Sequence, residues 1–236
     1  MTSEFVAIGL LWYVVFLLST TAHEASHAFA AKLGGDLTAF HGQQTSLNPL
    51  PHIRREPFGM VLVPILTYVT GGWMMGWASA PYDPYWQQKH PRRAAWMSLA
   101  GPAANFALAV IAGIAVHTGI LMGVFAPPAS ANFQRIVEST GPGLAEGAAK
   151  FLSLLFSLNV LLGTFNLLPI PPLDGFSALG LFMSENGARR LETLRQSARN
   201  FSFVGLLLGW QLFAKIYDPL FTLALRVLYP TMMYGR

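Results

Sequence analysis

The chain has 236 residues, of which 53% are hydrophobic and 11% charged, and its formal net charge is +4. With a mean hydropathy of +0.44, this composition excludes a soluble globular protein, because so few charged residues cannot cover a globule of this length. The absence of cysteine excludes disulfides, thiolate metal ligands and a cysteine nucleophile, and the basic residues are too scattered for a nucleic-acid-binding patch.

Five apolar runs follow one another along the chain, each about as long as a membrane-spanning helix. They predict an all-α polytopic membrane protein with about four to six transmembrane helices, embedded in a lipid bilayer. The runs cover residues 5–33, 58–80, 94–124, 147–168 and 201–229. Because the chain has no internal repeat, we expect one membrane-embedded domain over residues 1–236, with a core at about 5–180 and a C-terminal membrane segment at about 201–229.

The first run ends in a motif that suits a metal ion. The run lacks the basic start of a signal peptide, so we expect it to be retained. Near its end stand His23 and His27 with Glu24 between them, and histidines four residues apart lie on one side of a helix. Ionisable groups inside an apolar run must each find a partner, so the pattern predicts a metal site rather than two core histidines.

The loop charges predict an orientation. Basic residues in the loops after the first, second and fourth runs place these loops in the cytoplasm, so the histidines lie near the cytoplasmic edge of the membrane. Both loops that flank residues 58–80 are basic, which favours a re-entrant or β-like element there over the alternative, a plain transmembrane helix. Pro64 and Gly71-Gly72 permit the bend. Such an element could pair with an extended substrate, and prolines along Met60 to Leu66 would test this.

The end of the fourth run supplies a third metal ligand. A catalytic metal site needs three protein ligands and one open position. Here the run ends in Asn166-Leu167-Leu168-Pro169, further prolines follow, and Asp174-Gly175 comes directly after them. An ordinary Asp-Gly turn is the alternative interpretation, but it does not explain why a proline-broken helix places the aspartate at this depth. We therefore expect Asp174 to lie beside the two histidines.

Three motifs together resemble the site-2 protease family of intramembrane zinc metalloproteases, peptidase M50. They are His23 to His27, Gly101-Pro102-Ala103-Ala104-Asn105 and Asn166 to Gly175. The resemblance extends over about residues 12–179 and is to the compact bacterial branch that lacks a PDZ or CBS module. In that branch Asn48-Pro49-Leu50, His52 and Gly76-Trp77-Ala78 also recur.

The resemblance implies a role for each site residue. His23, His27 and Asp174 would bind one zinc ion per chain, Glu24 would be the general base, and Asn166 would support the oxyanion. Small residues surround Asn105, so we expect it to join helices by hydrogen bonds rather than to take part in catalysis.

The predicted function is hydrolysis of peptide bonds in or near transmembrane segments by an intramembrane zinc metalloendopeptidase. The expected partner is a membrane protein or a membrane-anchored peptide as substrate, with no nucleic acid, and the oligomeric state stays open. The expected location is the cell membrane of a bacterium, as a multi-pass protein with its active site toward the cytoplasm. Two alternatives are a metal-ion carrier and a catalytically inactive membrane scaffold that use the same His/Asp site.

Other polar residues carry weaker predictions. His41 and His52 are expected to pack in a loop or at the surface, although a gating role or a spare ligand is open to them. Lys215 and Asp218 interrupt the last run and could form an ion pair three residues apart; the alternatives are a kink at Pro219 or two half-spans. The basic segment 185–200 is expected to rest on the anionic inner leaflet.

Overall fold

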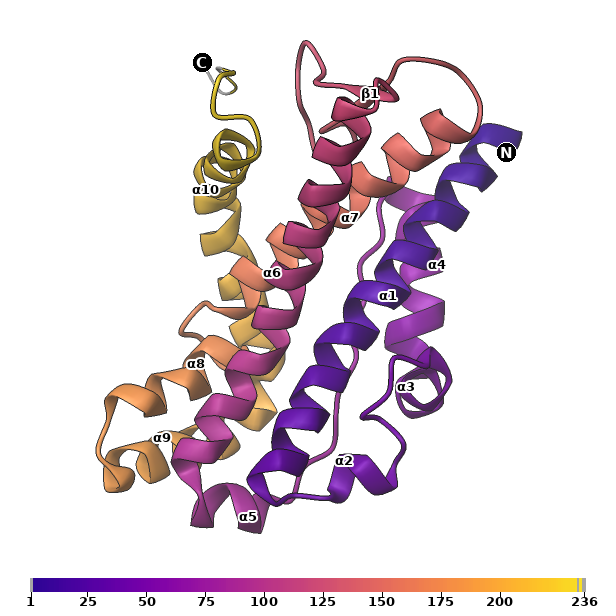
Figure 1. The fold of residues 1–236 in the computed structure, drawn as a ribbon. Coiled ribbons are helices and arrows are strands. Elements are labelled where there is room, and N and C mark those ends of the chain that lie inside the picture. The colour runs from indigo at the N-terminus through magenta and orange to yellow at the C-terminus, as the bar shows by residue number, and fades with distance from the viewer. Residues whose placement is uncertain (1, 233, 235–236) are drawn as a thin grey trace.

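Long helices dominate the fold (Figure 1). The computed structural model describes residues 2–232 and 234. Among these residues, three helices are long and apolar enough to cross a membrane: α1 (Ser3–Gly34), α6 (Pro91–Leu121) and α7 (Leu144–Asn166). The prediction of an all-α polytopic membrane protein is confirmed, and the total of four to six spans stays a prediction beyond these three.

A fourth long helix, α10 (Ser202–Leu228), carries Lys215, Asp218 and Pro219 in its middle. Shorter elements connect the long helices. The remaining elements are α2 (Thr38–His41), α3 (Pro49–Arg55), the π-helix η1 (Phe58–Leu62), α4 (Val63–Gly71), α5 (Pro84–Lys89), β1 (Phe125–Ala126), β2 (Glu138–Ser139), α8 (Asp174–Ala178), η2 (Leu179–Phe182), α9 (Glu185–Ser197) and η3 (Ala198–Phe201).

Local sequence signals set the ends of α1. The hydroxyl of Thr2 accepts a hydrogen bond from the backbone N–H of Phe5, and Glu4 lies in the first turn, where the helix dipole favours an acid. Gly35 ends the helix with a φ of 99°, a left-handed conformation that suits glycine. The apolar run of the sequence therefore becomes one continuous helix that carries the metal motif near its C-terminal end.

Residues 58–80 form a hairpin of helix and extended chain. The helix reaches only to Gly71, and Gly72, with a φ of 73°, reverses the chain, so the alternative of a plain transmembrane helix is wrong. Figure 1 shows the chain returning in extended form from the end of α4 to α5. The β-like part is extended without a strand partner, because β1 and β2 form the one sheet of the described residues.

One contact with α1 and one within the hairpin show that the chain leads back toward its starting level. The hydroxyl of Tyr68 donates to the carbonyl of Phe5 near the start of α1 at 2.6 Å. The returning chain then donates from the backbone N–H of Trp77 to the carbonyl of Gly59 at 3.1 Å. This is the re-entrant path that the sequence predicts, with a helical ascending limb.

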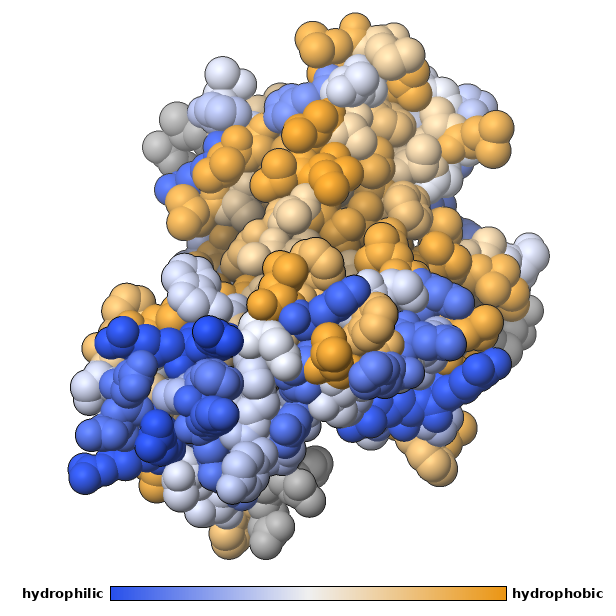
Figure 2. All heavy atoms as spheres, turned by 60° about the horizontal axis from the view of Figure 1, so that its bottom comes forward, coloured by the Kyte–Doolittle hydropathy of each residue, from blue (hydrophilic) through white to orange (hydrophobic). Residues whose placement is uncertain are grey.

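The core lies between α1, α6 and α7, which pack against one another. Trp12, Val15 and Phe16 of α1 are at most 2% exposed, and they form a hydrophobic cluster with Val116 of α6 and Leu154 of α7. Figure 2 shows hydrophilic residues gathered at the end of the molecule that carries α2, α5 and α9, whereas hydrophobic residues cover much of the surface above it. This distribution suits a bundle whose polar end projects from a bilayer.

Two predictions about charged segments need correction or refinement. Among the described residues, Lys215 and Asp218 do not form an ion pair with each other. The helix α10 continues through Pro219. In α9, Leu191 is buried against the protein, whereas Leu194 is 61% exposed. The contact of this segment with the inner leaflet stays a prediction.

Candidate metal centre

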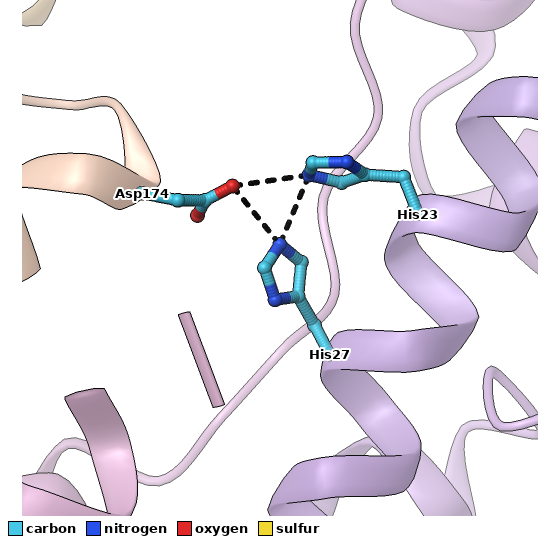
Figure 3. A group of neighbouring side chains, drawn as sticks. All are labelled: His23, His27 and Asp174. Carbon is cyan, nitrogen blue, oxygen red and sulfur yellow. Dashed lines mark hydrogen bonds and ion pairs between the residues drawn. The ribbon is translucent and has the colours of Figure 1, made fainter. Parts of the chain in front are cut away.

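Three of the predicted site residues meet at one point. His23 and His27 extend from α1, and Asp174 begins α8 (Figure 3). The two Nε2 atoms lie 3.0 Å apart, and Oδ2 of Asp174 lies 3.1 Å from Nε2 of His23 and 3.2 Å from Nε2 of His27. The histidines are buried and the aspartate is partly buried. Residues 147 positions apart in the sequence thus offer three ligand atoms to one small space.

The far side of each imidazole is held by an oxygen atom. Nδ1 of His23 donates to Oδ1 of Asn105 at 2.6 Å, and Nδ1 of His27 donates to the backbone carbonyl of Met97 at 2.7 Å. Because a neutral imidazole carries one proton, these bonds assign it to Nδ1 and leave the lone pair on Nε2. Both lone pairs then face the carboxylate of Asp174. A cation between the two Nε2 atoms and this carboxylate could be bound by all three groups.

Gly101 keeps the space beside the two Nε2 atoms open. A Cβ atom at this position would lie 2.5 Å from Nε2 of His23 and still closer to Nε2 of His27. These separations are close to metal–nitrogen bond lengths of about 2.0–2.1 Å. A methyl group would therefore occupy the space that a bound ion needs, which explains the glycine at the start of the Gly-Pro-x-x-Asn motif.

A buried network of polar side chains joins the three central helices behind His23. Asn105 of α6 donates from Nδ2 to Oδ1 of Asn159 on α7 at 2.8 Å, and Asn159 donates to the hydroxyl of Ser19 on α1 at 2.8 Å. All three side chains are fully buried. Asn105 thus joins helices as predicted, but it also orients His23. Asn159 and Ser19 were not predicted from the sequence, although an asparagine inside an apolar run is a usable signal.

The loop after α7 delivers Asp174 to the histidines. Proline lacks a backbone N–H, so Pro169 and the prolines after it end the helix just beyond Asn166. A side chain at Gly175 would overlap the backbone carbonyl of Leu167, so the glycine allows the loop to fold closely over the helix end. The Asp-Gly pair therefore opens the helix α8 next to a packed loop, so the alternative of an ordinary Asp-Gly turn is wrong.

A cavity of about 350 Å³ opens beside the three ligand atoms. Glu24 is 9% exposed and lines this cavity together with Asn166. The amide nitrogen of Asn166 donates one hydrogen bond to the carbonyl of Leu162 at 3.0 Å, which leaves its second N–H without an assigned acceptor. The cavity thus contains all five predicted site residues. The extended chain at residues 77–82 forms part of its wall.

A charged cluster at the rim ties α9 to this extended wall. Arg195 of α9 lines the cavity and donates to Oε1 of Glu192 at 2.8 Å and to the hydroxyl of Tyr82. Burial raises the pKa of the Glu192 carboxyl, while the neighbouring guanidinium of Arg195 opposes that shift. The sequence does not predict this cluster, because a basic amphipathic segment is more often a solvated surface.

The two loop histidines differ in their surroundings. His41 is exposed at the end of α2, as the surface interpretation predicts, whereas His52 is 1% exposed and packs from α3. Its Nε2 donates to the carbonyl of Ser46 at 3.3 Å, and within the described part of the chain its Nδ1 has no partner. Burial lowers the pKa of His52, opposed by the bond to Ser46 and by the charge of Glu24. His52 does not belong to the group of potential metal ligands among the described residues.

Known proteins with similar sequences are described as zinc metalloproteases. A Bacillus subtilis protein described as "Putative zinc metalloprotease YwhC" is 33% identical over 172 residues, which cover 72% of this chain and 68% of the relative. "Putative zinc metalloprotease Rip2" of Mycolicibacterium smegmatis is 32% identical over 200 residues, covering 82% of this chain and 65% of the relative. "Putative zinc metalloprotease Rip2" of Mycobacterium tuberculosis is 31% identical over 189 residues, which cover 80% of this chain and 63% of the relative. No solved structure gives a significant match.

The family match covers most of the chain and contains every residue of the cavity group. The chain spans about two thirds of the length of the relatives it matches. Residues 11–210 match Peptidase family M50, a range that includes the motif on α1, the glycine and asparagine of α6, and Asp174. Sequence, fold and site geometry agree on one conclusion: this chain belongs to peptidase family M50.

Proposed function

We propose that the chain is an intramembrane zinc metalloendopeptidase that hydrolyses peptide bonds in or near transmembrane segments of membrane proteins. The observation that carries the proposal is the convergence of His23, His27 and Asp174 beside a cavity that also contains Glu24. The ligand set also fits zinc. Two imidazole nitrogens and one carboxylate oxygen are ligands that zinc accepts in catalytic sites, and the cavity leaves a fourth position open.

Glu24 is proposed as the general base. A zinc ion held by the two histidines and Asp174 would polarise the scissile carbonyl and lower the pKa of a water molecule to about 7. Glu24 neighbours His23 in the sequence and lines the cavity, so its carboxylate can take the proton of the attacking water and pass it to the leaving amine. The carboxylate therefore acts twice in one turnover.

Asn166 is proposed to stabilise the oxyanion. One of its two amide protons is held by the carbonyl of Leu162, which fixes the plane of the side chain, and the second is free to reach a developing negative charge. A donor of this kind contributes about 3 kcal/mol to transition-state stabilisation where such donors have been removed from other enzymes. The bond to Leu162 supports this assignment because it orients the amide in advance.

The extended chain at residues 77–82 is proposed to bind the substrate as a strand. A helical substrate must unwind before hydrolysis, because helical hydrogen bonds occupy its carbonyl groups. The carbonyl of Ser79 accepts a hydrogen bond from Gln44, and neighbouring backbone groups in an extended chain point to opposite sides. Within the described residues, the backbone groups of Ala78 and Ala80 have no hydrogen-bond partner. The sequence predicts substrate pairing for the whole element at residues 58–80, with test prolines along Met60 to Leu66. Because Phe58–Gly71 is helical, we assign the pairing to the extended limb and move the test prolines there.

The protein is further proposed to lie in the bacterial cell membrane with its cavity toward the cytoplasm. The hydrophilic end of the molecule in Figure 2 is the end that carries α2, α5 and α9 in Figure 1. The C-terminal end of α1 lies on that side, and the metal motif is in the C-terminal half of this helix. Water can reach a site at that depth.

A cleavage assay in liposomes that compares wild type with Glu24→Gln tests the proposed activity. The amide cannot accept the proton, so we expect cleavage of a model transmembrane substrate to be lost while bound zinc stays at the wild-type level. Glu4→Gln, the same change at the exposed start of α1, is the matched control and should cleave normally. Equal cleavage by wild type and Glu24→Gln would exclude this mechanism. A wild type that binds zinc and cleaves none of a panel of membrane substrates would favour the scaffold or carrier alternatives.

A further inference from the structure

A stripe of exposed residues, three with polar side chains and one leucine, runs along α10. Leu208, Gln211, Lys215 and Asp218 are all exposed, and they are separated by three, four and three residues. This spacing places them on one face of the helix and is the repeat that two helices use when they pack side by side. We call these four residues the α10 stripe.

The α10 stripe lies opposite the face that packs on the protein. Phe213 is 2% exposed, and its ring lies 5.3 Å from the ring of Phe165 on α7. Tyr217 continues this inner face, one turn further along, with its ring 5.3 Å from that of Phe213. Because Lys215 is two residues from each of these aromatic residues, its side chain points about 160° away from both, toward the surroundings of the bundle.

The stripe also lies at the middle depth of the bundle. Near one end of α10, Gly205 packs closely on the carbonyl of Pro171 in the loop before Asp174. At the other end, the carbonyl of Leu228 accepts a hydrogen bond from His117 of α6 at 2.7 Å. Lys215 is the midpoint of the 27 residues of α10, about 20 Å from each end, whereas half of the hydrocarbon layer is about 15 Å thick.

Charges at this position are costly when they face lipid. In the described part of the chain, neither Lys215 nor Asp218 takes part in an ion pair. Pro219 has no N–H to donate to the carbonyl of Lys215 four residues earlier, so a backbone acceptor on the same turn also lacks its helical partner. Ionisable residues within a membrane almost always face protein or water, so a protein partner is the natural cover for this stripe.

We propose that the α10 stripe is the contact between two copies of this chain, related by a twofold axis along the membrane normal. The stripe carries one positive and one negative group, so its charges are complementary to those of a second copy of the same stripe. Two copies in one membrane have parallel α10 helices. Asp218 of one copy then lies about 4.5 Å along the axis from Lys215 of the other, a displacement that the long lysine side chain can bridge. Two reciprocal ion pairs result, one on each side of the axis.

Disulfide crosslinking of single-cysteine variants in liposomes tests this contact, and the natural chain provides a cysteine-free background. Leu208→Cys lies on the stripe and is expected to form a covalent dimer on oxidation. Ile114→Cys on α6 is the matched control, because Ile114 is 61% exposed and Leu208 57%. We expect the control to remain monomeric. Equal crosslinking at the two positions, or no crosslinking at Leu208→Cys, would overturn the proposal, as would a covalent product with a different membrane protein in native membranes.

Charge reversals separate a contact between copies from an ion pair within one copy. Lys215→Asp alone and Asp218→Lys alone each place like charges opposite one another in a homodimer, so both should lose the crosslink of Leu208→Cys. Mixing the two single reversals creates opposite charges across the interface, so differently tagged chains should crosslink to each other again. Failure of the mixture to recover the crosslink would contradict the proposal. Folding is checked by elution of each variant as a single detergent-solubilised species, and the result does not depend on proteolytic activity.

Discussion

At the scale of single residues, the site depends on how each imidazole is held. The pair His23 and His27 and the glutamate between them could be predicted from their spacing, because helical geometry alone places the histidines on one side. Their orientation could not be predicted, since it depends on Asn105 and the carbonyl of Met97, which come from a different helix. A sequence pattern gives the ligands, whereas tertiary packing determines which nitrogen atom faces the metal.

Gly101 provides a residue-scale prediction. In Gly101→Ala, the added methyl group would occupy the space beside both Nε2 atoms, so we expect zinc affinity to fall by at least about tenfold, as it does when groups around a metal site are changed. Zinc titration of the purified protein measures this. Gly147→Ala on α7, where a methyl group meets open space, is the matched control and should bind zinc normally. Unchanged affinity in Gly101→Ala would show that the ion does not occupy this space.

At the scale of elements, residues 58–80 show where sequence patterns reach their limit. The flanking charges predicted a re-entrant path, and Gly71-Gly72 marked the reversal of the chain. The division into a helical and an extended limb was not predictable, because short apolar runs suit either structure. Contacts within the hairpin decide it: a Cβ atom at Gly76 would overlap Pro64, so only a glycine lets the extended limb lie against the helix.

The extended limb provides an element-scale prediction. In Ala78→Pro and Ala80→Pro the backbone loses the N–H groups proposed to pair with the substrate, so cleavage should fall strongly while zinc binding persists. Ala129→Pro, in an exposed loop that already follows a proline, is the control and should retain activity. Cleavage of a transmembrane substrate in liposomes, with zinc content measured in parallel, gives the answer. Full activity in both limb variants would rule out strand pairing at this segment.

At the scale of the whole molecule, the bundle places the site between helices that are far apart in the sequence. The apolar runs predicted the long helices to within a few residues, since length and hydropathy are local properties. The meeting of α1 with the loop after α7 was predicted only from the depth of both motifs and from family resemblance. The rim cluster of Arg195, Glu192 and Tyr82 was beyond sequence reasoning, because it depends on how α9 folds back over the cavity.

Orientation in the membrane is a whole-molecule prediction. Arg54 is exposed near the end of α3, and Arg92 is exposed in the first turn of α6. Single cysteines at these two positions should react with a membrane-impermeant thiol reagent only when it is supplied from the cytoplasmic side. A cysteine at Ala129, in the loop between α6 and α7, should react only from the outside. Labelling of right-side-out and inverted vesicles distinguishes the two sides. The reverse pattern would place the cavity outside the cytoplasm and contradict the proposed localisation.

Zinc content and coordination in the purified protein, measured by metal analysis and X-ray absorption, test most directly the claim that α1 and the start of α8 hold one ion. We predict one zinc per chain, bound by two imidazole nitrogens at about 2.0–2.1 Å and a carboxylate oxygen at about 2.0–2.2 Å. Asp174→Ala should lose most of the zinc, whereas Asp83→Ala, at the exposed cap of α5, should keep it. Absence of zinc from the wild type, or a zinc content that Asp174→Ala leaves unchanged, would contradict the account.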